Sequence, residues 1–236
     1  MAVSLFDSLA AWFADFGYKF YKAFLFEDRW HLYLDGLGKT LSITAGAICI
    51  STVLGMILCL MKLSKHRWLR WPAQVYIDII RGIPVIVQLL IIYNVILLSW
   101  NNKVAVAIVA FAVNSAAYVA ELFRSGINAV DPGQTEAGRS LGLSKFQTMR
   151  FIVFPQGIKN CLPTYASEFI VLVKETAVVG YIGLQDLTKA YSAVQSLTYD
   201  AMAPLFIIAV AYLAITTTLS KIFSYMERRL RQSDRR

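Results

Sequence analysis

Long stretches of this chain carry no charged residue. Residues 40–61 contain no Asp, Glu, Lys or Arg, and a helix of that length, at about 1.5 Å per residue, covers a hydrocarbon layer of roughly 30 Å. Residues 82–102, 104–120 and 201–220 are similar runs. The chain is 57% hydrophobic and 16% charged, which is too apolar for a soluble domain. The sequence therefore predicts an all-α protein that crosses a membrane several times.

A further apolar segment, residues 162–184, contains Glu168, Lys174 and Glu175. Three charges near the centre of a span cost roughly 7–10 kcal/mol, while the apolar residues there return only about 3–5 kcal/mol. We therefore expect about five transmembrane helices, with this fourth one inside the bundle or along a watery cavity. The second helix is expected to begin early, within residues 71–80, where the apolar pattern continues.

The positions of the basic residues predict the orientation. Placing the N-terminus outside and the C-terminus inside puts most of the 23 Lys and Arg residues in cytoplasmic connections, as the positive-inside rule requires. The net charge of +8 is then a topology signal, and nucleic acid is not an expected partner. Residues 1–34 have aromatic residues at helical spacing and are expected to form an amphipathic interfacial helix. Residues 35–227 would form the transmembrane domain, and residues 228–236 a basic cytoplasmic tail.

Several kinds of chemistry are not expected. The three cysteines are odd in number without C-x-x-C spacing, and the two histidines stand alone, which argues against a disulfide framework or a metal site. The first 25 residues lack the pattern of a cleaved signal peptide. An intramembrane enzyme is disfavoured because H-E-x-x-H does not occur and both histidines lie outside the predicted spans.

The longest connection, residues 125–161, is predicted to lie inside and to be structured. Asp131 and Pro132 form a helix-start pair and Gly142 is placed to end the helix, so a short helix is expected over residues 133–141. A second helix would follow and end near Pro155. Such a helical hairpin suits a groove on another protein; a well-packed loop without a partner is the alternative.

This loop resembles the E-A-A…G…I-x-L-P loop in the membrane subunits of bacterial ABC importers, through Glu136-Ala137-Gly138, Gly142 and Ile152-Val153-Phe154-Pro155. Gly138 replaces the second alanine of that pattern and Phe154 its leucine. Further segments resemble the polar amino-acid branch of the family: Arg81-Gly82-Ile83-Pro84-Val85 with Gln88, Ala117-Tyr118-Val119-Ala120-Glu121 with Arg124-Ser125-Gly126-Ile127, Pro132-Gly133-Gln134, Phe154-Pro155-Gln156, Lys174-Glu175-Thr176 and Ile182-Gly183-Leu184-Gln185-Asp186-Leu187. The resemblance covers about residues 35–225.

The resemblance implies a type I ABC importer permease fold in the bacterial cytoplasmic membrane. It implies two ABC ATPase subunits that bind ATP and Mg²⁺, a second permease subunit (identical or homologous), and an extracytoplasmic amino-acid-binding protein. The loop helix would be the coupling helix, with its contact and turn positions at Glu136, Ala137, Gly138, Leu141 and Gly142. This chain has no G-x-x-x-x-G-K-[ST] sequence. It is therefore expected to hold no cofactor itself and to leave ATP hydrolysis to the partner.

Polar residues inside the predicted spans are candidates for substrate binding. A free amino acid needs a cationic or N–H donor for its carboxylate and an acidic acceptor for its ammonium group. We assign Glu168 to the ammonium group or a cationic side chain, and Arg81 to the carboxylate. The other candidates are Gln88, Asn114, Tyr118, Glu121 and Lys174.

Three alternatives stay open at this stage. The intramembrane charges, Arg124 and Glu175 among them, could simply pair with one another to hold the bundle. The glycines and prolines at positions 84, 163, 180 and 183 fit either hinges or close helix packing. A self-contained ion-coupled carrier or channel is the rival function, although the chain shows no inverted halves. The carboxylates lean slightly towards a cationic amino acid, but Arg81 and Lys174 can neutralise them.

Overall fold

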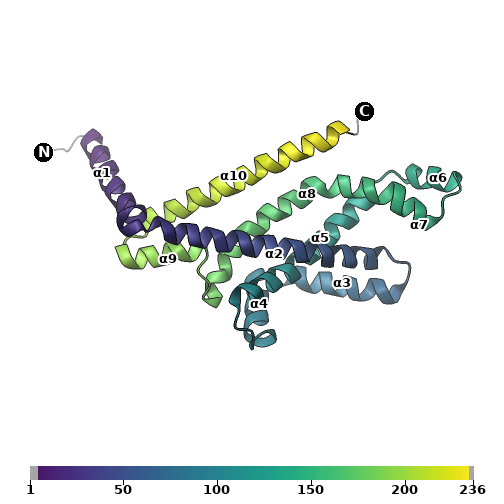
Figure 1. The fold of residues 1–236 in the computed structure, drawn as a ribbon, viewed down its shortest axis with the longest axis horizontal. Helices are drawn as coiled ribbons and strands as arrows, with labels where there is room; N and C mark the ends of the chain where they lie inside the picture. Colours follow the sequence, from purple (N-terminus) through teal and green to yellow (C-terminus); the bar gives the residue numbers. More distant parts are fainter. Residues whose placement is uncertain (1–4, 234–236) are drawn as a thin grey trace.

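The computed structural model describes residues 5–233, and within these residues every regular element is helical (Figure 1). Residues 1–4 of the predicted N-terminal helix and 234–236 of the predicted tail lie outside the described part. The α-helices are α1 (Leu5–Phe24), α2 (Trp30–Leu63), α3 (Arg67–Gly82), α4 (Val85–Ile91), α5 (Lys103–Asn128), α6 (Pro132–Ser140), α7 (Lys145–Thr148), α8 (Phe154–Glu175), α9 (Leu187–Thr198) and α10 (Met202–Ser233). Shorter 3₁₀ and π turns are η1 (Phe26–Asp28), η2 (Ile92–Ile96), η3 (Met149–Val153) and η4 (Thr176–Ile182).

Helices α2, α5 and α8 form the centre of the bundle. In Figure 1, α6 and α7 lie at one end of the molecule, and α1 and α9 lie at the other. Small residues allow this packing, because α5 is lined with buried alanines at Ala107, Ala110, Ala112, Ala116, Ala117 and Ala120. Of the most apolar 18-residue stretch of α5, 67% is buried, whereas only 17% of the corresponding stretch of α10 is buried. Helix α5 is therefore central and α10 peripheral.

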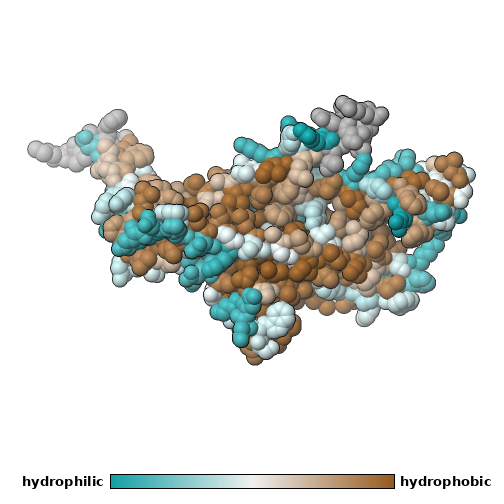
Figure 2. Space-filling model, in the orientation of Figure 1, coloured by the Kyte–Doolittle hydropathy of each residue, from teal (hydrophilic) through white to brown (hydrophobic). Residues whose placement is uncertain are grey.

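The prediction of an all-α membrane protein is confirmed. Among the described residues, Phe26–Leu63, Lys103–Asn128 and Met202–Arg229 are long and apolar enough to span a membrane. The pair Arg67–Gly82 and Val85–Ile96 would form a fourth span, and the charged α8 runs through the bundle beside α5. Figure 2 shows apolar residues over the middle of the molecule and hydrophilic residues gathered towards its ends.

The second predicted span differs from expectation. Instead of one continuous helix, α3 and α4 meet at a bend of 107°. Pro84 lies at this break, with an extended residue, Ile83, before it. Proline has no N–H to continue the helical hydrogen bonds, and its ring disfavours helical geometry in the preceding residue. The bend is the physical result of this proline.

The predicted helix end near Pro155 is wrong. Helical structure continues from Lys145 through η3 into α8, and Pro155 lies in the first turn of α8. The wide π turn of η3 changes the hydrogen-bond register just before the proline, where the missing N–H is tolerated. Pro163 also lies inside α8 without ending it. Of the residues considered as hinges, Gly183 ends η4 in the left-handed region at φ 74°.

Asp186 fixes α9 at the end of the bundle away from α6 and α7. Its buried carboxylate accepts hydrogen bonds from the backbone N–H groups of Lys189 (2.8 Å) and Thr188 (3.1 Å), which caps the helix. A Cβ added at Gly36 of α2 would lie 2.6 Å from the Asp186 carbonyl oxygen. Only glycine therefore lets α2 approach this turn closely.

Candidate functional site

Asn114, Tyr118 and Glu121 of α5 face α4, α3 and α2, respectively. The Arg81 guanidinium of α3 lies 5.3 Å from the centre of the Tyr118 ring, a cation–π distance. One turn earlier on α5, the buried Asn114 donates its side-chain N–H to the Gln88 side-chain oxygen at 3.2 Å. Four of the predicted substrate residues are thus brought together between α5 and the bent α3–α4 pair.

Gln88 bridges the break between α3 and α4. Its side-chain amide donates to the carbonyl oxygens of Ile80 and Ile83, both at 2.7 Å. These carbonyls lie beside Pro84, where the regular helical pattern is interrupted. Both amide hydrogens of Gln88 are therefore committed to the backbone. In this conformation, Gln88 stabilises the bend and has no free N–H to offer a substrate.

Arg81 differs from Gln88 because its charge is available. The side chain is exposed, and no ion pair is formed by Arg81 within residues 5–233. Its contact with the Tyr118 ring orients the guanidinium without neutralising it. This arrangement suits a group that receives a carboxylate.

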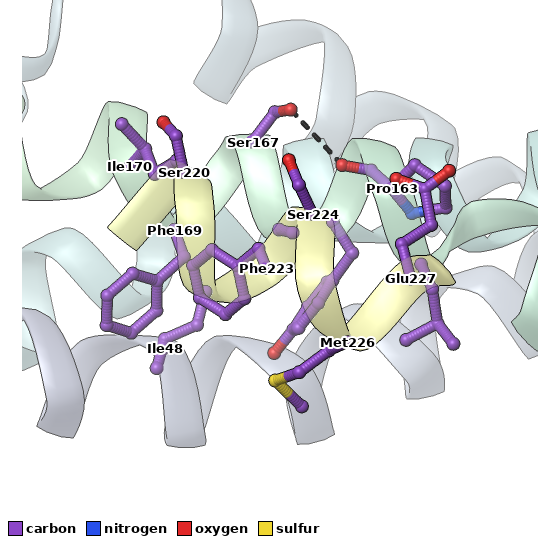
Figure 3. Close-up of a pocket in the computed structure, with 13 residues that line it drawn as sticks. Ile48, Pro163, Ser167, Phe169, Ile170, Ser220, Phe223, Ser224, Met226 and Glu227 are labelled. Carbon is purple, nitrogen blue, oxygen red and sulfur yellow. Dashed lines mark hydrogen bonds between the residues drawn. The ribbon is translucent and has the colours of Figure 1, made fainter. Parts of the chain in front are cut away.

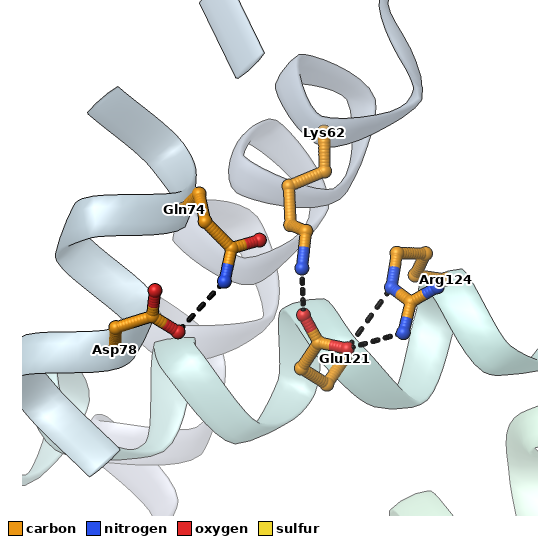
Figure 4. Close-up of polar contacts among 5 residues, drawn as sticks. All are labelled: Lys62, Gln74, Asp78, Glu121 and Arg124. Carbon is orange, nitrogen blue, oxygen red and sulfur yellow. Dashed lines mark hydrogen bonds and ion pairs between the residues drawn. The ribbon is translucent and has the colours of Figure 1, made fainter. Parts of the chain in front are cut away.

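Glu121 lies between two cations near the end of α5 (Figure 4). One carboxylate oxygen pairs with the Lys62 ammonium group of α2, and the other accepts two hydrogen bonds from Arg124, at 2.7 and 2.9 Å. The alternative of structural pairing therefore describes Glu121 and Arg124 well. This triad ties α2 to α5 where both helices approach the α6–α7 end.

Glu168 belongs to a different contact, between α8 and α5. Its side chain is partly buried and accepts a hydrogen bond from the Ser115 hydroxyl at 3.0 Å. No described cation forms an ion pair with Glu168. Glu175 is also partly buried two turns further along α8, whereas the neighbouring Lys174 is exposed. Glu168 thus offers an unpaired acceptor inside the bundle, as a binding site for an ammonium group requires.

A cavity of about 630 Å³ lies between α8 and α10, beside α2 (Figure 3). Its walls are mainly apolar, with Phe169, Ile170 and Phe223 among them, and hydroxyl groups come from Ser167, Ser220 and Ser224. The Ser167 hydroxyl donates a hydrogen bond to the Pro163 carbonyl oxygen at 3.1 Å. Along this part of their length, α8 and α10 are separated by the cavity.

The predicted coupling hairpin is present and well ordered by its sequence. The Asp131 carboxylate caps α6 by accepting from the Gly133 N–H at 2.7 Å, and Gly142 ends the turn at φ 83°. Ser144 and Gln147 form a reciprocal capping box at the start of α7. Gly138 is buried, and a Cβ there would lie 2.8 Å from the Ile152 side chain. The glycine therefore lets α6 pack closely against the following helix.

The outer face of this hairpin is exposed and partly apolar. Leu141 is 81% exposed and Phe146 71% exposed, and Glu136 and Ala137 are exposed as well. Exposed large apolar side chains at the end of a molecule indicate a contact surface. Four of the five predicted coupling positions thus lie on the surface, while Gly138 supports the packing beneath it.

The hairpin is joined firmly to the bundle. Helical structure runs from Lys145 to the end of α8, and Gln156 donates to the Gln134 side-chain oxygen of α6 at 3.2 Å. Helices α5 and α8 touch at their backbones: a Cβ added at Gly126 would lie 2.5 Å from the Gly157 carbonyl oxygen. The hairpin and α8, which carries Glu168, are therefore joined by continuous helical structure.

Residues 51–232 match the model of a protein family described as the binding-protein-dependent transport system inner membrane component. The chain belongs to this family. Its members are the membrane permease components of ABC importers, and ATPase activity lies in a separate subunit. The permease is thus a bacterial inner-membrane protein that works with ATPase and permease partners, and it is not the enzyme of the assembly.

Individual relatives agree with this assignment. The permease is 38% identical over 204 residues to the arginine transport system permease protein ArtQ of Bacillus subtilis (strain 168), which covers 85% of this chain and 93% of the relative. It is 32% identical over 206 residues to the glutamate/aspartate import permease protein GltK of Escherichia coli O6:H1. This match covers 83% of this chain and 92% of the relative.

Solved structures extend the comparison. A crystal structure of an amino acid ABC transporter with histidines has a chain with 46% identity and a TM-score of 0.80, covering 84% of the permease and 94% of that chain. The MetNI methionine ABC transporter in an inward-facing conformation, at 20% identity and a TM-score of 0.75 over 86% and 97% of the two chains, shares the fold. The predicted type I importer permease fold is confirmed.

Several contacts of the permease were not predicted. They include the hydrogen bond from the Ser115 hydroxyl to Glu168 and the ion pair between Lys62 and Glu121. A third is the hydrogen bond between the hydroxyls of Thr52 and Tyr165. Hydroxyl groups within apolar spans need partners, so the residue types gave a signal. Which helix supplies each partner depends on packing that the sequence alone does not specify.

Changing Gly142 to valine is expected to slow transport, because a β-branched residue at positive φ costs about 1–3 kcal/mol. A Cβ at this position meets no atom within 4 Å, so the effect would come from the backbone alone. Gly142→Asn provides the matched control, since asparagine tolerates this conformation. ATP-driven uptake should rank glycine above asparagine and asparagine above valine. Equal uptake by the asparagine and valine variants would contradict a role for this turn geometry.

Proposed function

We propose that this permease moves a polar or charged amino acid into the cytoplasm as one of two permease subunits. Two ATPase subunits would bind ATP and Mg²⁺ and drive the cycle, and an extracytoplasmic binding protein would deliver the substrate. The observation that carries this proposal is the 46% identity, over 84% of the chain, with a chain of an amino acid ABC transporter. The names of ArtQ and GltK support an amino acid as the substrate class.

The proposed orientation places the coupling hairpin in the cytoplasm. The exposed face of α6 and α7 then meets the ATPase subunits, while α1 and α9 lie at the outer side. This orientation puts the N-terminus outside and the C-terminal end of α10 inside, in agreement with the distribution of basic residues. The N-terminal helix supports an interfacial position, because Trp12, Phe13 and Phe20 remain exposed on its surface.

The proposed mechanism is alternating access between two cavity shapes. Closure of the ATPase pair would displace the hairpin, and α8 would move with it because the helix is continuous from Lys145. The polar contacts between α8 and its neighbours include those of Glu168 with Ser115 and of Tyr165 with Thr52. We propose that these contacts are remade during the cycle, which would change the availability of Glu168 to the substrate.

The proposed recognition of substrate uses separate groups for its two charges. Glu168 would accept the ammonium group or a cationic side chain, and Arg81 would receive the carboxylate. Neither side chain forms an ion pair among the described residues. Tyr118 lies beside Arg81 and Asn114 contacts Gln88, and both would shape the site. Glu121 has both oxygens engaged by cations, so we assign it a supporting role.

Uptake by the reconstituted assembly tests the function. The permease, its ATPase and its binding protein would be placed in vesicles, and uptake of radiolabelled arginine, glutamine and glutamate measured with ATP inside. We expect uptake of at least one of these amino acids only when ATP is present. Uptake driven by a proton or sodium gradient without ATP would instead support a self-contained carrier.

Glu168→Gln is expected to lower arginine uptake about tenfold to hundredfold, because a charge-assisted hydrogen bond is lost at a partly buried site. Glutamine uptake should fall less if the carboxylate binds a cationic side chain. Glu175→Gln, the same change two turns along α8, is the matched control and should leave arginine uptake close to that of the unmodified permease. Unchanged arginine uptake in the Glu168 variant would remove this residue from the site.

A further inference from the structure

The turn between α2 and α3, with the first turns of α3, forms a basic and aromatic surface. We call it the α3 basic patch; it consists of Lys65, His66, Arg67, Trp68, Arg70 and Trp71. Trp68 is 72% exposed and Trp71 65% exposed. Exposed indole rings beside basic residues are typical of the boundary between lipid tails and headgroups. The patch lies outside the polar contacts between α3–α4 and α5.

The helical spacing of α3 separates this patch from the bundle. Ala73 and Ile77 face inwards and are buried, and Ile77 packs with Ala117 and Ala120 of α5. A neighbouring face, about a quarter turn round the helix, carries residues at i, i+3, i+4 and i+7, which therefore lie together. They are Arg67, Arg70, Trp71 and Gln74, and they line a cavity of about 310 Å³. A second hollow shares Arg67 and Trp71 with this cavity. It is lined by Lys65, His66, Arg67, Trp68 and Trp71.

The patch has no acidic counterpart of its own. No Asp or Glu occurs from residue 63 to residue 77, and Lys65, Arg67 and Arg70 form no ion pair within residues 5–233. Two acidic side chains near this end of α2 and α3, one on α5 and one on α3, have other partners. Glu121 is held by Lys62 and Arg124, and Asp78 accepts from the Gln74 amide at 2.7 Å (Figure 4).

The coupling hairpin brings further positive charge to this region. Contact with the like-charged Lys65 lowers the pKa of the Lys145 ammonium group at the start of α7. Arg139 of α6 contributes in the same direction. The α2–α3 turn, α3 and the hairpin thus bring cations together at one end of the molecule, and an anion from outside the chain would relieve their repulsion.

The combination of guanidinium groups and exposed indoles selects one kind of anion. Guanidinium groups bind phosphate oxygens through paired hydrogen bonds, and tryptophan is favoured at the boundary between lipid tails and headgroups. A free phosphate would leave both indoles in water. We propose that the α3 basic patch binds an anionic phospholipid of the cytoplasmic leaflet, with Arg67 and Arg70 on its phosphate and Trp68 and Trp71 against its glycerol and upper acyl chains.

This inference rests on the proposed orientation, which places the α2–α3 turn on the cytoplasmic side, but its test does not require transport. The assembled transporter would be reconstituted in vesicles of phosphatidylcholine with phosphatidylglycerol, extracted, and examined by native mass spectrometry for retained lipid. We expect the unmodified permease to retain phosphatidylglycerol in preference to phosphatidylcholine. Arg67→Gln with Arg70→Gln should reduce that retention about tenfold or more, as expected for the loss of two charge-assisted contacts.

Arg228→Gln with Arg229→Gln is the matched control, because it removes two exposed guanidinium groups from the same end of the molecule. It should retain phosphatidylglycerol nearly as the unmodified permease does. Arg67→Lys with Arg70→Lys keeps the charge and should retain an intermediate amount, which separates lipid binding from misfolding. Trp68→Ala with Trp71→Ala should also lower retention, while leaving any weak binding of free glycerol phosphate unchanged.

Three results would overturn the proposal. One is equal retention of phosphatidylglycerol by the Arg67→Gln/Arg70→Gln variant and by the Arg228→Gln/Arg229→Gln control. A second is retention of phosphatidylcholine and phosphatidylglycerol in the proportions of the vesicles. The third is loss of the ATPase subunits from the Arg67 and Arg70 variant with lipid retention unchanged, which would make the patch a protein contact. Loss of amino-acid uptake alone bears on the proposed function and leaves these lipid measurements unaffected.

Discussion

Replacing Gly157 with leucine is expected to prevent the permease from assembling. A Cβ at this position would lie 2.8 Å from the Ile127 Cα atom, so the clash is with backbone that cannot rotate away. Helices α5 and α8 would have to separate, which disrupts the packing around the buried Cys161 as well. Overpacking of this kind costs about 3 kcal/mol or more. We expect little folded permease in the assembled complex and a lowered thermal unfolding midpoint in the fraction that remains.

Gly38 provides the matched control for this substitution. It lies on α2 with no atom within 4 Å of an added Cβ, so Gly38→Leu should leave assembly intact. Both variants would be measured by the yield of complex after solubilisation and by its thermal unfolding midpoint. If the two variants gave the same yield and midpoint, close contact between α5 and α8 would not be needed for assembly.

Glu136→Arg is expected to abolish ATP-driven uptake while the permease still inserts into the membrane. The carboxylate is exposed on α6 beside Ala137, and within the part of the chain that the structure describes it forms no ion pair. Reversal of its charge at a protein contact costs about 2–5 kcal/mol, which weakens binding by about 30-fold or more. The expected result is a permease that is present at normal levels and retains little ATPase.

The control is the same charge reversal at Asp35, an exposed residue near the start of α2. Copurification of the ATPase with each variant separates the two cases. We expect retention with Asp35→Arg and loss with Glu136→Arg, and Glu136→Gln should lie between them. Retention of the ATPase and full uptake with Glu136→Arg would refute the assigned role of this hairpin.

Much of the fold follows from the distribution of charge along the chain. The predicted spans 40–61 and 104–120 lie within α2 and α5, and the predicted span 201–220 lies within α10 except for its first residue. The errors lie at prolines. Pro84 breaks a helix where a long apolar run favoured continuity, whereas Pro155 leaves a helix intact. The outcome depends on local hydrogen bonding, supplied by Gln88 in one case and by a π turn in the other.

The candidate site was partly predictable for a similar reason. Helical periodicity correctly groups Asn114, Tyr118 and Glu121 on one side of α5, and each of them contacts a residue of α4, α3 or α2. The partner of each residue is a property of tertiary packing and could not be read from spacing. The assignment of a substrate role to these residues stays a prediction. The coupling loop was easier to predict, because caps and turn glycines act within a few residues.

The crossing at Gly157 divides the rod formed by α7, η3 and α8 into two arms. From Lys145 to Gly157 the helix extends about 18 Å, and from Gly157 to Glu168 about 16 Å. The second arm also contacts α5, through Cys161, Tyr165 and Glu168. A rotation of the rod about Gly157 would move the hairpin and Glu168 by similar amounts in opposite directions, and it would have to break these contacts, the hydrogen bond from Ser115 to Glu168 among them.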